Sequence, residues 1–297
     1  MNKIISLFIP PIFGILIRKL ISVFRKQYSI GKIPISIPPF YDLPNIQKKH
    51  RLYDRFLPIL CESLQSDKLI YDIGANIGDT TIAIAQVSRN KIIAVEASER
   101  YKKYLKNNIQ KAIKLCGSDI TIVQAMIGTG DLSGGLVHTT AGTARLEIDA
   151  KTPPVTFTRL DTIVKQNGPP CLVKVDTDGF DFDVLMSGGE LLRDWKPILF
   201  WENEIKDEYQ LQGFSKLYQA LSDAGYSSLC IFDNYGNWMF EIADPIMLNN
   251  LNYYLLSLNQ YKHTRTFYYI DVLAYTARDK ELCEKALAKY RSTHILK

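Results

Sequence analysis

Four short apolar segments of this chain, each with the residue types of a buried β-strand, carry a carboxylic acid at their carboxyl end. They span residues 68–73, 91–96, 171–176 and 197–202, and their acids are Asp72, Glu96, Asp176 and Glu202. Helical patterns separate the segments, and this alternation predicts a single doubly wound α/β domain, a parallel sheet covered by helices. Ligands of such folds bind beyond the carboxyl ends of the strands. We therefore expect the four acids to surround one crevice.

The remaining patterns extend this domain over residues 45–297. Helices are predicted at residues 54–64, 80–87, 98–114, 158–166, 182–192, 214–224, 245–258 and 279–291. Further strands are predicted at residues 119–127, 228–232, 238–242 and 266–276, and the second and third of these flank an Asn-Tyr-Gly-Asn turn that indicates a hairpin. Residues 128–154 are rich in Gly and Thr and interrupt the alternation, so we interpret them as a β-hairpin insertion beside the crevice.

Residues 1–44 are expected to precede this domain as an amphipathic helix and a proline-rich linker. The uncharged stretch 4–17 is shorter than the roughly 18 residues that a membrane-spanning helix needs. From Phe13 to Phe24, an apolar stripe flanked by basic residues suits a helix lying in a membrane interface. The same stripe also suits a helix packed on its own domain or on a partner subunit of a homo-oligomer. Residues 29–44 contain four prolines and are expected to run extended.

The overall composition excludes some classes of protein. The net charge of +5 comes without a long Lys/Arg block, so we expect no nucleic-acid partner. The five cysteines are scattered and form no CxxC pair, which argues against a structural zinc site and favours a reducing compartment. We therefore expect a cytoplasmic protein, attached to the inner face of the membrane if the N-terminal helix binds lipid.

The first acid opens a glycine turn, Asp72-Ile73-Gly74-Ala75-Asn76-Ile77-Gly78-Asp79. Its G-x-x-x-G spacing differs from the G-x-G-x-x-G of dinucleotide-binding proteins. Acids on both sides of the turn would repel a pyrophosphate and suit a cationic ligand such as S-adenosylmethionine, which carries an ammonium and a sulfonium. Glu96 ends the next strand, where a carboxylate can accept both hydroxyls of a ribose.

A second group of acids follows the third of these strands, in the run Lys174-Val175-Asp176-Thr177-Asp178-Gly179-Phe180-Asp181. Carboxylates packed this densely are costly unless they are paired or used in chemistry. Lys174 lies within a buried strand, where a lone charge is expensive, so we expect it to pair with one of these carboxylates. The acids can also converge on a hard cation, but their spacing matches no EF-hand loop, and no metal site is predicted.

The runs IYDIGANIGDTT, AVEAS, TRLDTI, LVKVDTDGFDFDVLMSGGELL and PILFWENE together resemble the FkbM family of S-adenosylmethionine-dependent methyltransferases. The resemblance covers roughly residues 53–204. It implies a Rossmann-like class I methyltransferase fold, with a mostly parallel seven-stranded sheet, helices on both faces and an antiparallel last strand. Thr177 and Asp178 stand where family members commonly have Val and Glu, and Asp181 where they commonly have Glu. These variants look like a sub-branch associated with surface-glycan synthesis.

The resemblance also implies roles for individual residues. Gly74, Asn76 and Gly78 would hold the methionine part of S-adenosylmethionine, and Asp72 would help to orient it. The remaining implied contacts are Glu96 with the ribose, Met126 beside the adenine, and Asp176 and Asp178 facing the reacting methyl group.

Methyl transfer in this family usually goes to a hydroxyl oxygen, so the implied acceptor is a sugar, glycan precursor or related small molecule. A neutral hydroxyl is a poor nucleophile, so a general base is useful. The candidates are Asp178, which is the first choice, Glu202 and His50. A nicotinamide-dependent oxidoreductase and a non-catalytic, membrane-associated scaffold with the same fold are the alternatives.

Overall fold

The computed structural model describes residues 27–39, 41–130, 135–138, 144–147, 156–260 and 267–295. The helix predicted between Phe13 and Phe24 lies outside these residues. Among the helices that are described, none combines the length and apolar character needed to cross a bilayer.

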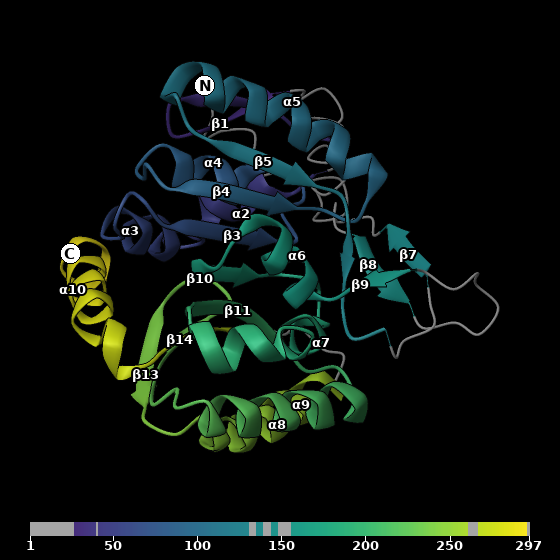
Figure 1. Cartoon of the computed structure of the whole chain (residues 1–297), viewed down its shortest axis with the longest axis vertical. Coiled ribbons are helices and arrows are strands. Elements are labelled where there is room, and N and C mark those ends of the chain that lie inside the picture. The colour runs from purple at the N-terminus through teal and green to yellow at the C-terminus, as the bar shows by residue number, and fades with distance from the viewer. Residues whose placement is uncertain are drawn as a thin grey trace, which may run out of the picture.

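The centre of the molecule is an eight-stranded sheet with the order β13-β12-β14-β11-β10-β3-β4-β5 (Figure 1). Its strands are β3 (Leu69–Ile73), β4 (Lys91–Val95), β5 (Ile120–Val123), β10 (Pro170–Val175), β11 (Ile198–Glu204), β12 (Ser228–Asp233), β13 (Trp238–Ile242) and β14 (Tyr269–Tyr275). Five neighbouring strands of the sheet, β5, β4, β3, β10 and β11, run parallel to one another. The last strand of the chain, β14, is antiparallel to both of its neighbours. The predicted α/β fold is confirmed, and the eighth strand is β13, the second arm of the predicted hairpin.

Helices cover both faces of the sheet because its central strands are apolar on both sides. On β3, Ile70 belongs to one buried cluster, together with residues of α3 (Phe56–Glu62), α4 (Asp79–Ala85), α5 (Glu99–Cys116) and α10 (Lys280–Tyr290). The next residue, Tyr71, faces the second cluster, which contains α6 (Leu160–Asn167), α7 (Asp181–Met186), α8 (Glu208–Asp223) and α9 (Leu248–Gln260). Successive side chains of a strand point to opposite faces, so each central strand contributes to both cores.

The chain reverses its direction across the sheet between β3 and β10. From β3 the chain moves through β4 to β5 at one edge, and it returns to the other side of β3 through β10 and β11. The loops after β3 and β10 therefore lie side by side at the carboxyl edge, as they do at the switch point of any doubly wound sheet. These loops carry the glycine turn and the cluster of acids.

The proline-rich segment differs from its prediction as a linker. β1 (Gln27–Ile30) and β2 (Ile33–Ser36) pair antiparallel, and β2 packs on α5. Ile33 and Ile35 are buried there, because β2 places both apolar side chains on the same face. A further short helix, α2 (Leu43–Lys49), begins with Pro44 in its first turn, where proline fits a helix.

Two other elements differ from the predicted ones. The predicted strand 119–127 divides into β5 and β6 (Met126–Ile127), and β6 pairs with β9 (Phe157–Thr158). The predicted helix 182–192 ends at Met186, before Gly188 and Gly189, and the chain resumes as the π-helix η2 (Leu191–Trp195). Within the expected insertion, β7 (Gly135–His138) and β8 (Ala144–Glu147) pair antiparallel. Short turns of helix, η3 (Pro245–Met247), η4 (Ala277–Asp279) and η5 (Arg291–Ile295), complete the order.

Candidate active site

The turn between β3 and α4 requires glycine at two positions. Gly74 has a φ of 77°, and a Cβ atom there would lie 1.9 Å from the carbonyl oxygen of Asp176. Gly78 has a φ of 88°, and its Cβ would lie 2.7 Å from Leu105 Cδ1 of α5. Asn76 also adopts a left-handed conformation, with a φ of 49°. The glycines thus let the turn press against both the loop after β10 and α5.

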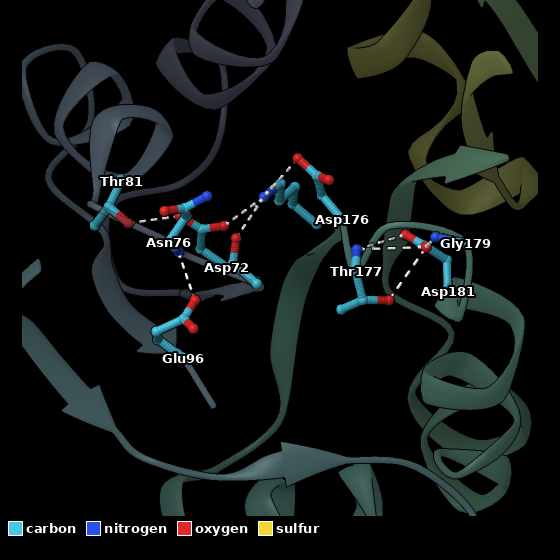
Figure 2. Close-up of polar contacts among 10 residues, drawn as sticks. Asp72, Asn76, Thr81, Glu96, Asp176, Thr177, Gly179 and Asp181 are labelled. Atoms are coloured by element: carbon cyan, nitrogen blue, oxygen red, sulfur yellow. Dashed lines mark hydrogen bonds and ion pairs between the residues drawn. The ribbon is translucent and has the colours of Figure 1, made fainter. Parts of the chain in front are cut away.

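Glu96 clamps this turn from the neighbouring strand (Figure 2). Its Oε2 accepts a hydrogen bond from the Asn76 backbone N–H at 2.8 Å, and its Oε1 accepts one from the Ser98 N–H at 2.7 Å. Burial raises the pKa of Glu96, while these two hydrogen bonds lower it. Each carboxylate oxygen keeps a free lone pair, so the side chain is held in place and can still accept ligand hydroxyls.

Lys174 joins the turn to the loop after β10. Its Nζ lies 3.1 Å from Asp72 Oδ1, 3.4 Å from Asp176 Oδ2 and 3.3 Å from the carbonyl oxygen of Gly74. Burial alone would lower the pKa of Lys174, but the charges of Asp176 and Asp72 raise it above its ordinary value. Asp72 also accepts a hydrogen bond from Thr81 Oγ1 at 2.5 Å. The expected pairing of Lys174 is confirmed, and the cation is shared by two strand-end acids.

Asp181 organises the loop that follows. It is fully buried and accepts hydrogen bonds from Thr177 Oγ1 at 3.1 Å and from the N–H groups of Thr177 and Gly179, each at 3.3 Å (Figure 2). Burial and the nearby Asp176 raise the pKa of Asp181 to about 8. These hydrogen bonds direct the carboxyl oxygens of Asp181 at the loop. Among the described residues, no group of three or more His, Cys, Asp or Glu side chains is arranged to hold a metal ion.

A cavity with about 690 Å³ of empty space, part of it open to solvent, lies beside the glycine turn. Its lining includes most of the predicted cofactor residues: Gly74, Asn76, Glu96, Met126 and Asp176. Asp178 also lines it. We call this space the first cavity.

Two predicted cofactor residues lie behind the wall of the first cavity. Asp72 is fully buried and contacts Lys174, and Gly78 begins α4 and packs against α5. They act by holding the turn in place. Sequence reasoning missed Tyr101, Phe157 and Asp183, which also line the cavity. Tyr101 belongs to the apolar stripe of α5, which by itself indicates only core packing.

A second cavity, of about 600 Å³, adjoins the first, because Asp176 lines both. Glu202, one of the predicted bases, lies here together with Asp54, Tyr269 and Asp271, which the sequence did not single out. No local pattern marks these three residues. Tyr269 and Asp271 are brought here by β14, which is inserted beside β11. Asp54 is brought here because the chain before α3 crosses the same edge of the sheet.

His50 lies in the lining of neither cavity. Its ring stacks on that of Tyr235, with the centroids 3.6 Å apart and the planes 6° from parallel. Desolvation and the charge of Lys49 lower the pKa of His50. Of the three predicted bases, Asp178 therefore reaches the first cavity and Glu202 the second, and His50 reaches neither.

Comparison with solved structures gives remote likenesses. An O-methyltransferase from Bacillus cereus in complex with SAH shares 13% identity, with 79% of this chain and 89% of that chain covered and a TM-score of 0.43. A precorrin-6y C5,15-methyltransferase from Geobacter metallireducens shares 12%, with coverages of 74% and 87% and a TM-score of 0.39. A methyltransferase FkbM from Methylobacillus flagellatus shares 13%, with coverages of 78% and 58% and a TM-score of 0.38. A comparison with curated proteins gave no match.

A family model gives the stronger result. The model described as "Methyltransferase FkbM domain" matches residues 72–228, which is more than half of the chain. The match begins at Asp72, before the glycine turn, and includes both strand-end loops and β11. The strand order and the lack of the dinucleotide-binding glycine spacing both agree with a methyltransferase. The family match therefore decides against the nicotinamide-dependent oxidoreductase that the sequence left as an alternative. The chain belongs to the FkbM family of methyltransferases.

Proposed function

We propose that this protein is an O-methyltransferase that acts on a hydroxyl group of a sugar, glycan precursor or related metabolite. The cofactor of this family is S-adenosylmethionine, whose sulfonium supplies an already activated methyl group. The observation that carries the proposal is the meeting of two cavities at Asp176: one with groups that suit this cofactor, the other lined by carboxylates and aromatic rings.

The residues of the first cavity fit S-adenosylmethionine. Glu96 presents two oriented oxygens to ribose hydroxyls, and Gly74 lines the cavity beside it. The Asn76 side-chain oxygen is buried without a hydrogen-bond partner among the described residues, and an ammonium group can satisfy it. Met126 offers an apolar surface to a purine. Positioning of this kind is the main task of an enzyme that uses an activated donor.

The structure favours Glu202 over Asp178 as the base. A base must reach the acceptor hydroxyl, and Glu202 lines the cavity next to the cofactor site, whereas Asp178 lines the cofactor site itself. Burial and the charge of Asp176 raise the pKa of Glu202 well above that of an ordinary carboxyl group, so it holds a proton more readily. Asp178 is then a residue that shapes the cofactor loop, with a left-handed φ of 55°.

Isothermal titration of the purified protein with S-adenosylmethionine, S-adenosylhomocysteine and NAD tests the cofactor site. We expect the two adenosyl compounds to bind and Glu96→Ala to weaken both by about 10- to 100-fold, because the variant loses hydrogen bonds from a charged group. Glu99→Ala removes an exposed carboxylate three residues away and is the matched control. Binding of NAD alone, or equal affinities for both variants, would contradict the assignment.

A further inference from the structure

The second cavity has a row of three carboxylates along its floor. Glu202 on β11 and Asp271 on β14 are directly paired in the antiparallel register. Asp176 comes one residue after the Val175–Trp201 pair and so lies beside Glu202. Directly paired residues point to the same face, with Cβ atoms about 4.5–5.5 Å apart. All three acids line the second cavity.

This row holds more carboxyl groups than the cations around it can pair with. Lys174 is shared by Asp72 and Asp176, and the other cation in the lining is the exposed Arg55. Within the described part of the chain, neither Glu202 nor Asp271 takes part in an ion pair or a side-chain hydrogen bond. Carboxyl groups that remain unpaired in the lining of a cavity are available to a ligand that donates hydrogen bonds.

Aromatic rings form much of the remaining wall, from Tyr53, Phe56, Phe200, Phe232 and Tyr269. Flat apolar surfaces of this type pack well against a ring that is apolar on its face and polar at its rim. An anionic ligand would lose its hydration shell beside unpaired carboxylates, which is costly. The lining therefore fits an uncharged ring that carries hydroxyl groups.

We infer that the second cavity is the acceptor site, in which Glu202 and Asp271 act as one carboxylate pair that receives the acceptor's hydroxyl proton and excludes anionic acceptors. This inference rests on the proposed methyltransferase function. A lone pair of the hydroxyl oxygen forms the new O–CH₃ bond, and the broken S–CH₃ bond leaves its electron pair on sulfur. The hydroxyl proton passes to the carboxylate pair. The products are a methyl ether and S-adenosylhomocysteine, and charge is conserved.

The surroundings suit the pair to this task. Burial raises the pKa values of Glu202 and Asp271 well above those of ordinary carboxyl groups, and the charge of Asp176 raises both further. Asp54 also raises the pKa of Asp271, whereas Lys174 lowers it. Two neighbouring carboxylates titrate as a unit, so one proton can be shared between them. A base of this kind takes up a proton nearer to neutral pH than an isolated carboxylate does.

The experiment compares acceptors that differ in charge at one position. S-adenosylhomocysteine formation is measured with methyl glycosides, with the corresponding methyl uronates and with hexose 6-phosphates. We expect methylation of uncharged glycosides and a kcat/KM at least about tenfold lower for a matched uronate. Preference for uronates or phosphates would overturn the inference.

Variants test the pair directly. Glu202→Gln and Asp271→Asn should each lower kcat by about 100-fold or more while the Kd for S-adenosylhomocysteine stays unchanged. Asp271→Asn should also move the acid limb of the pH–rate profile to lower pH, because Glu202 loses a like-charged neighbour. Glu241→Gln on β13 is the control, since it lies outside both cavities.

The outcomes separate this inference from the proposed function. Wild-type protein that fails to bind S-adenosylhomocysteine would contradict the cofactor assignment. Protein that binds it but methylates no glycoside in the panel would overturn the acceptor inference alone. Full activity in both variants would remove the role of the pair.

Discussion

Gly74 shows how a single residue can join the two halves of a site. Its position has no room for a side chain, because the carbonyl oxygen of Asp176 occupies the place where a Cβ would lie. This close approach brings the loop after β3 against the loop after β10. The two cavities meet at this point, because Asp176 lines both. A glycine at this position is thus required by packing as well as by its positive φ.

Substitution of Gly74 should separate these two requirements. Gly74→Ala should destabilise the protein by more than about 3 kcal/mol, since it adds a backbone clash to the cost of a left-handed alanine. Gly117→Ala is the control, because Gly117 has a φ of 67° but nothing within 4 Å of its Cβ position. It should cost only about 1–2 kcal/mol. Urea unfolding measures both, and equal losses would show that the clash relaxes without cost.

Asp181 should make the stability of the protein depend on pH. Its folded-state pKa of about 8 exceeds the ordinary value of 3.8, so its contribution to stability is complete below about pH 4 and is lost as the pH rises towards 8. The fall is up to about 1.4 kcal/mol per pH unit. Asp181→Asn should flatten this part of the profile in urea unfolding between pH 5 and 8. The exposed Asp223→Asn should not, and identical slopes in all three proteins would refute the prediction.

At the scale of elements, α5 connects the N-terminal hairpin with the cofactor turn. The buried Asn108 accepts a hydrogen bond from Ser36 N–H at 2.7 Å and donates to the carbonyl oxygens of Ser36 and Ile77, each at 2.9 Å. One side chain thus links β2 to the residue that precedes Gly78. The hairpin is therefore part of the support for the turn.

Asn108→Ala should weaken both stability and cofactor binding. Three backbone groups lose their partner, so we expect a loss of about 2–4 kcal/mol and a several-fold higher Kd for S-adenosylhomocysteine. Its neighbour Asn107 is exposed on the same helix, and Asn107→Ala is the control. Thermal unfolding and isothermal titration check the two effects. A stability loss without any change in Kd would show that the hairpin does not support the turn.

At the scale of the whole molecule, the sheet sets the two cavities side by side at its carboxyl edge. The first lies over β3 and β4, and the second over β10, β11 and β14. Asp176 at the end of β10 lines both cavities. Under the proposed function, the cofactor and the acceptor therefore approach the same point from different strands.

The N-terminal segment can also be tested in the whole molecule. If the stripe from Phe13 to Phe24 lies in a membrane interface, the full-length protein should sediment with anionic liposomes and a protein lacking residues 1–24 should not. Added salt should weaken the binding, because basic residues flank the stripe. Equal partitioning of the two proteins would instead favour packing of the segment on the protein itself or on a second copy.

Local patterns in the sequence predicted the elements well and the second cavity poorly. β3, β4 and β10 are continuous apolar runs, and α5 has a regular stripe with Ser98 as its N-cap, whose side chain accepts a hydrogen bond from Tyr101 N–H. The proline-rich β2 was missed, because prolines obscure a short strand whose burial depends on a distant helix. Asp271 was missed for a related reason, since a single acid within an apolar strand has no local signature.

The sequence by itself determined the strand–helix alternation, the glycine turn, the strand-end acids Asp72, Glu96 and Asp176, and the need of Lys174 for a carboxylate. These follow from neighbouring residues, because hydrophobic periodicity, positive φ and the cost of a buried charge act over short stretches of chain. Only the tertiary structure decided which acids share a cavity. The insertion of β14 beside β11 pairs Asp271 with Glu202, and the path between α2 and α3 places His50 on Tyr235. Strand order arises from the packing of the whole sheet, which no local pattern encodes.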